Sequence, residues 1–97
     1  MIIDFELITD KLLNKQIKIE SMNSIGELGI VCNLTVESVE IETSQWFGYK
    51  VTINNTVKIL FDKAEICDLE ELKHCMCLFR SEEELVDIYL PEGMTWE

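Results

Sequence analysis

Apolar residues recur with a helical period at the start of this chain and then alternate with polar ones. Between residues 4 and 14, Phe5, Ile8 and Leu12 are spaced by three and four, which predicts one apolar stripe on a helix. The odd-numbered positions from 1 to 7 are also all apolar, so an initial strand is the competing prediction.

Residues 15–61 follow the two-residue period of β-strands. The segments QIKIESM and GIVCNLTV alternate, and NSIGELG between them supplies turn residues. Up to Val36 the apolar residues of this alternation occupy even-numbered positions, but after Glu37 and Ser38 they occupy odd-numbered ones, Val39 and Ile41. A slip of one residue moves side chains to the opposite face of a sheet, so we expect a bulge or tight bend at this point.

The segment YKVTINNTVKILF predicts a hairpin. A three-residue loop at 54–56 places Val51 opposite Ile59 and Tyr49 opposite Phe61, so that apolar residues meet across the strands. A two-residue loop would pair apolar with polar side chains. We therefore predict the three-residue loop, with an asparagine in the left-handed conformation that this residue tolerates.

The last third of the chain carries signals of helices. Asp68 with Glu71, and Ser81 with Glu84, have the spacing of a capping box, and apolar stripes at helical spacing follow each pair. These features predict two helices. Residues 75–90 also alternate in stretches, so a terminal hairpin is the competing prediction.

These elements indicate one domain of residues 1–97 with an α+β fold. We expect a small curled antiparallel sheet of four to five strands, an SH3-like barrel or open roll, with an N-terminal helix and a helical C-terminal third. A chain of 97 residues is long enough to bury one core without disulfides or metals.

Acidic residues outnumber basic ones by 19 to 8, which gives a net charge of −11. The excess is uneven: residues 1–64 hold nine acidic and six basic residues, and residues 65–97 hold ten and two. A surface of this sign repels nucleic acids and anionic membranes and attracts a basic protein partner. High negative charge also keeps a small protein soluble, which is a sufficient explanation by itself. The oligomeric state has no signature in the sequence.

The sequence predicts a cytoplasmic protein. The first residues lack the basic and apolar pattern of a secretory signal, and no apolar run reaches the roughly 20 residues of a spanning helix. In that compartment we expect the four cysteines to be reduced and packed as small apolar groups, in preference to disulfides.

Trp46 is the candidate binding residue of the segment SQWFGYK. If the segment is extended, Trp46 and Lys50 lie on the face opposite Tyr49, and Glu40 and Glu42 lie beside them on the preceding strand. A tryptophan next to carboxylates suits a partner's arginine or lysine through cation–π contact and ion pairing. The alternative is that helices cover this face and make Trp46 a core residue.

A second hypothesis rests on the densest acidic run, formed by Glu82, Glu83, Glu84 and Asp87. In the first turn of a helix, three of these four carboxylates would simply favour the helix dipole. As an exposed patch they would imitate a row of phosphates, as in inhibitor or immunity-type proteins that block nucleic-acid-binding enzymes.

The third hypothesis is a small enzyme or metal protein centred on His74 and the cysteines. Cys67, His74, Cys75 and Cys77 lie within eleven residues, but the spacing is not that of a zinc knuckle. On a helix, Cys75 and Cys77 would point about 200° apart. We therefore predict no zinc, no cofactor and no enzymatic activity. The leading hypothesis is a protein-binding module that engages a basic partner through Trp46, Glu40, Glu42 and Lys50.

Overall fold

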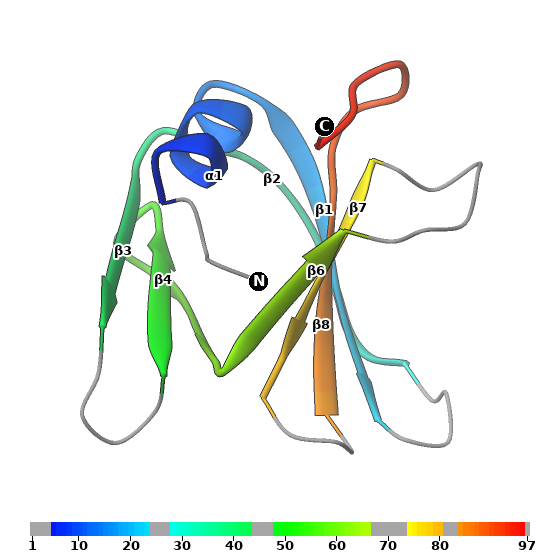
Figure 1. Cartoon of the computed structure of the whole chain (residues 1–97). Coiled ribbons are helices and arrows are strands. Elements are labelled where there is room, and N and C mark those ends of the chain that lie inside the picture. Colours follow the sequence, from blue (N-terminus) through cyan, green and yellow to red (C-terminus); the bar gives the residue numbers. More distant parts are fainter. Residues whose placement is uncertain (1–4, 24–27, 44–47, 67–73, 81–83, 97) are drawn as a thin grey trace.

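The computed structural model describes residues 5–23, 28–43, 48–66, 74–80 and 84–96 (Figure 1). These residues form one helix and eight strands. Their bounds are α1 Phe5–Leu12, β1 Gln16–Asn23, β2 Leu28–Thr35, β3 Val39–Thr43, β4 Tyr49–Ile53, β5 Val57–Phe61, β6 Lys63–Ile66, β7 Cys75–Phe79 and β8 Glu84–Tyr89.

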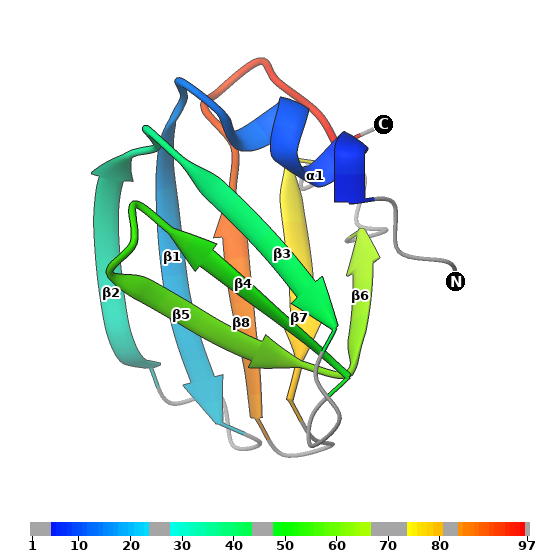
Figure 2. The ribbon, with the colours of Figure 1, turned by 90° about the vertical axis from the view of Figure 1, so that its left-hand side faces the viewer.

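The strands form two antiparallel sheets. The larger has the order β2-β1-β8-β7-β6 and the smaller the order β3-β4-β5. Figure 2 shows the three-stranded sheet lying across one face of the five-stranded sheet. The helix α1 and the C-terminal residues lie at the same end of this two-layered structure (Figures 1 and 2). One face of each sheet is thus covered by the other sheet.

The hydrophobic core fills the space between the layers. Both sheets and α1 contribute to it, and its buried members include Ile8, Leu12, Ile17, Ile19, Val51, Ile53, Ile59, Phe61, Met76, Leu78 and Ile88. Trp96, near the end of the chain, is fully buried and donates its indole Nε1–H to the carbonyl of Ile88 at 3.4 Å. Trp96 therefore belongs to the core, together with Leu90.

The predicted N-terminal helix is confirmed, and the competing strand is wrong. Ile8 and Leu12 are buried on one side of α1, as their spacing requires. Phe5 extends this stripe, and its ring meets that of Tyr49 edge-on with 5.5 Å between centroids. The helix is therefore attached to the three-stranded sheet.

The hairpin of β4 and β5 has the predicted register. Val51 pairs with Ile59 and Tyr49 with Phe61, and the aromatic pair stacks with centroids 5.5 Å apart. The loop consists of residues 54–56, in which Asn54 and its successor have φ angles of 54° and 59°. Both asparagines are thus in the left-handed region, which confirms that expectation.

The predicted bend after β2 is a crossing between sheets. β2 is an edge strand of the larger sheet, and β3 is an edge strand of the smaller one. Asn54 binds the connection: its Oδ1 accepts hydrogen bonds from the amides of Glu37 (2.6 Å) and Ser38 (3.1 Å). Its Nδ2 donates to the carbonyl of Thr35 at 2.8 Å.

The predicted fold class is wrong in two respects. The described residues contain eight strands in two sheets, where we expected one sheet of four to five strands, and none of the described residues of the C-terminal third is helical. The predicted capping box of Asp68 and Glu71 lies outside the described residues. β7 and β8 form the terminal hairpin, in which Met76 and Leu78 face the core at two-residue spacing. Glu84, expected to complete a capping box, is the first residue of β8. β8 also pairs with β1, and this long-range pairing overrides the local helical signals.

Candidate functional site

The face of the five-stranded sheet that points away from the core is lined by polar and ionisable side chains. Strand alternation, which buries Ile17, Ile19 and Ile88, sends their neighbours to this outer face. Two rows of paired residues cross it, one formed by Lys18, Tyr89 and Cys75, the other by Glu20, Asp87, Cys77 and Glu65. These rows bring together residues up to about 70 positions apart in the chain.

Tyr89 is the centre of the first row. The Lys18 Nζ lies 4.5 Å from the centroid of its ring and also forms an ion pair of 3.1 Å with Glu20. The ring of His74 lies 5.5 Å from the same centroid. Burial, together with the nearby thiol of Cys75, raises the pKa of Tyr89, so its hydroxyl stays protonated at neutral pH.

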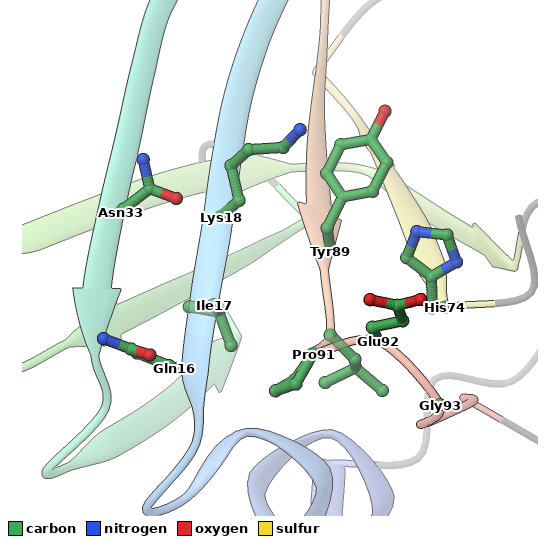
Figure 3. A pocket seen from close by; sticks show the side chains of 10 residues that line it. Gln16, Ile17, Lys18, Asn33, His74, Tyr89, Pro91, Glu92 and Gly93 are labelled. Carbon is green, nitrogen blue, oxygen red and sulfur yellow. The ribbon is translucent and has the colours of Figure 1, made fainter.

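An open pocket of about 790 Å³ adjoins Lys18 and Tyr89 of this row, at the edge of the sheet where β1 begins and β8 ends (Figure 3). Lys18, His74 and Glu92 line it as ionisable groups, and Leu90 and Pro91 add apolar surface. This mixture suits the binding of a small polar group or a side chain.

Two residues of the second row and Cys75 of the first row form a compact group of ligand-type atoms. The Sγ atoms of Cys75 and Cys77 and a carboxylate oxygen of Asp87 all lie within 4.8 Å of one another. Cys75 and Cys77 are alternate residues of β7 and therefore share a face, and Asp87 is paired with Cys77 on β8. Cys75 and Asp87 are buried, with 2% and 7% exposure. We call these three residues the thiol–carboxylate cluster.

Asp87 occupies an unfavourable position for a carboxylate. Burial raises its pKa, a hydrogen bond from the Cys77 thiol lowers it in part, and the charge of Glu20 raises it again. Its Oδ1 is buried and has no hydrogen-bond partner among the described residues. A buried polar atom without a partner is uncommon in folded proteins and calls for a specific explanation.

The two thiols of the cluster differ in acidity. The hydrogen bond from Cys77 lowers the pKa of Cys75, which is therefore the first to lose its proton. The same bond, burial and the adjacent Asp87 all raise the pKa of Cys77. Cys32, Cys75 and Cys77 are free thiols, and Cys67 lies outside the described residues.

The structure places three of the four predicted binding residues on one surface. Glu40 and Glu42 lie on the outer face of β3, and Lys50 lies opposite Glu42 on β4, with 2.8 Å between Nζ and Oε1. The hydrogen bond and charge of Lys50 lower the pKa of Glu42. Trp46 lies outside the described residues.

The predicted acidic patch is not a continuous surface in the described part of the chain. Glu84 is exposed at the start of β8, but Asp87 is buried. Residues three apart in a strand lie on opposite faces, whereas on the expected helix they would have shared one. Glu82 and Glu83 lie outside the described residues.

The cluster overlaps only partly with the metal candidates taken from the sequence. The argument that Cys75 and Cys77 point apart is wrong, because it assumed a helix. Asp87 was missed as their neighbour, since only the pairing of β7 with β8 brings it to Cys77. The competing alternation of residues 75–90 was the signal that could have revealed it. His74 lies outside this cluster and contacts Tyr89.

Among the described residues, no helix is both long and apolar enough to cross a membrane. The chain matches no protein-family model, no curated protein and no solved structure.

Proposed function

We propose that this chain is a non-enzymatic, cytoplasmic protein-binding module that engages a basic partner through the outer face of β3 and β4. One observation carries the proposal: Glu40 and Glu42 are both exposed on this face, on an edge strand. The net charge of −11 would steer a basic partner toward the molecule.

The two glutamates offer different contacts to a partner. No described cation forms an ion pair with Glu40, so its carboxylate is open to an incoming guanidinium. Glu42 is held by Lys50 at 2.8 Å, with the Lys50 side chain 32% exposed. Surface ion pairs of this kind contribute little because water and salt screen them, so exchange for an arginine is easy. Arginine also binds a carboxylate through two parallel hydrogen bonds, which lysine does not match.

Local charge on this face is balanced, which favours a specific contact over general attraction. Lys58 lies opposite Thr52 on the same outer face, so the two glutamates face two lysines there. A partner must therefore match the positions of Glu40 and Glu42. Trp46 belongs to the segment that joins β3 to β4, and the role we propose for it is cation–π contact with the same arginine.

The test compares binding of a poly-arginine peptide to two variants that change the net charge equally. The first variant is Glu40→Lys with Glu42→Lys. The matched control is Glu65→Lys on the other sheet with Glu92→Lys after the end of β8; Glu65 is likewise paired with a lysine, at 2.7 Å from Lys63. We expect the first variant to weaken binding about tenfold and the control less than about threefold.

Equal weakening by both variants would show that only net charge matters and would overturn the proposed surface. Circular dichroism of each variant checks that the fold is retained. The same pair then serves for affinity capture from the native cell, where a specific partner is retained by the control and lost by the Glu40 and Glu42 variant.

A further inference from the structure

We propose that the thiol–carboxylate cluster of Cys75, Cys77 and Asp87 is a binding site for a thiophilic divalent ion of the Zn²⁺ type. This inference is independent of the proposed protein contact, which lies on the other sheet. It also revises the expectation of no zinc, since that expectation depended on a helical C-terminal third.

The geometry of the cluster is close to that of a metal site. Tetrahedral zinc with bonds of about 2.3 Å to sulfur and about 2.0 Å to oxygen holds its ligand atoms roughly 3.5–3.8 Å apart. In the cluster, all three ligand atoms already lie within 4.8 Å of one another. All three residues lie on the paired strands β7 and β8, so the register of the hairpin brings their ligand atoms together.

The donor set selects the class of ion. Two thiolates and one carboxylate favour a borderline-soft ion such as Zn²⁺ over Mg²⁺ or Ca²⁺, which prefer oxygen ligands. Zinc sites use four ligands, so a fourth position remains for water or another donor. Glu20, opposite Asp87 in the same row, is the next carboxylate along the sheet, but its oxygen is already paired with Lys18.

The burial of Asp87 and its unpartnered oxygen are a second observation, separate from the distances, that favours a bound cation. Asp87 is only 7% exposed as a residue, its buried Oδ1 has no hydrogen-bond partner among the described residues, and Glu20 adds a second negative charge beside it. An apolar residue at this strand position would pack without the free-energy cost of burying an unpaired carboxylate. A bound cation would provide both the partner and the compensating charge. The competing explanation is a neutral hydrogen-bonded cluster, with Asp87 protonated and no ion.

Cobalt is the probe that distinguishes these explanations. The full-length protein is reduced, stripped of metal and titrated with Co²⁺, whose thiolate charge-transfer absorption reports sulfur ligands directly. We expect one Co²⁺ per chain with a thiolate band, and displacement of that band by Zn²⁺. The variant Cys77→Ser should reduce the intensity of the band, because one sulfur ligand remains, and bind at least about 100-fold more weakly, and Asp87→Asn should bind about tenfold more weakly.

Two controls define the site. Cys32→Ser changes a free thiol on β2, and His74→Ala removes the histidine that neighbours Cys75 in sequence but lies outside the cluster. Both should bind Co²⁺ within about threefold of the unchanged protein. Failure of the unchanged protein to take up Co²⁺ or Zn²⁺ would overturn the proposal, as would equal losses in the controls.

A measurement on the unchanged protein covers the case of a variant that does not fold. Zn²⁺ should protect Cys75 and Cys77 from alkylation, with each modified cysteine identified by peptide mass spectrometry, while Cys32 keeps its reactivity. Protection of another pair, or of none, would contradict the assignment.

Discussion

Replacing Asn54 by glycine tests how the crossing between the two sheets is stabilised. The Asn54 side chain makes three hydrogen bonds, accepting from the amides of Glu37 and Ser38 and donating to the carbonyl of Thr35. Glycine adopts the φ of 54° without strain, so Asn54→Gly removes these bonds and leaves the loop conformation permitted.

The size of the effect follows from the exposure of these bonds. A net hydrogen bond contributes about 0.5–1.5 kcal/mol, so three such bonds give an upper range of roughly 1.5–4.5 kcal/mol. The bonds to Glu37 and Thr35 are exposed, and water replaces part of each, whereas the bond to Ser38 is partly buried. We expect a loss of about 2 kcal/mol in the free energy of unfolding, or roughly 10 °C in the melting temperature of a domain this size.

Asn55→Gly is the matched control. Asn55 is the next residue, with a φ of 59° and an exposed side chain, so the two substitutions share the added freedom of the unfolded chain. Urea denaturation followed by circular dichroism gives both free energies. The difference between the two variants should be about 2 kcal/mol. A difference below about 0.5 kcal/mol would refute the view that the Asn54 side chain secures the crossing.

Two further predictions concern single residues. Gly48→Ala should lower the free energy of unfolding by about 1–3 kcal/mol in thermal or urea denaturation, because an added Cβ would lie 3.1 Å from the Asp62 Cα. Gly93→Ala is the comparison: its φ is 85° and its surroundings are open, so this substitution should lower the free energy of unfolding by only about 1 kcal/mol. Lys50→Met should return the pKa of Glu42, lowered by this lysine, toward 4.5, as followed by NMR titration of the carboxyl carbon. Because the pKa of Glu42 is depressed in the folded state, the stabilisation from its ion pair with Lys50 is present above pH 4.5 and is lost as the pH falls through the lowered pKa. A Glu42 pKa that is the same in the variant as in the unchanged protein would contradict the ion pair.

Local patterns predicted the elements whose determinants lie close together in sequence. The stripe of α1 depends on residues within one helical segment, and the register of β4 and β5 follows from a three-residue loop. The phase change at residues 37–38 correctly located the bend, because alternation is sensitive to a single inserted residue. The exposure of Glu40 and Glu42 followed from the same alternation.

The C-terminal third shows where local patterns were insufficient. Short apolar segments satisfy helical and strand periods alike, and capping-box spacings arise readily in a sequence with 19 acidic residues. β8 is a strand because it lies between β1 and β7 and pairs with both. The partner residues in β1 lie more than 60 positions away, so no local window contains this information.

The thiol–carboxylate cluster depended on the same long-range decision. The sequence determined that Cys75 and Cys77 are two residues apart, but that spacing separates them on a helix and unites them on a strand. Only the hairpin register adds Asp87, whose side chain is buried although it lies on the outer face of the larger sheet. The sequence by itself therefore determined composition, charge and local turns. The meeting of these three side chains was decided by tertiary structure, because hydrogen bonding between distant strands selects which faces residues share.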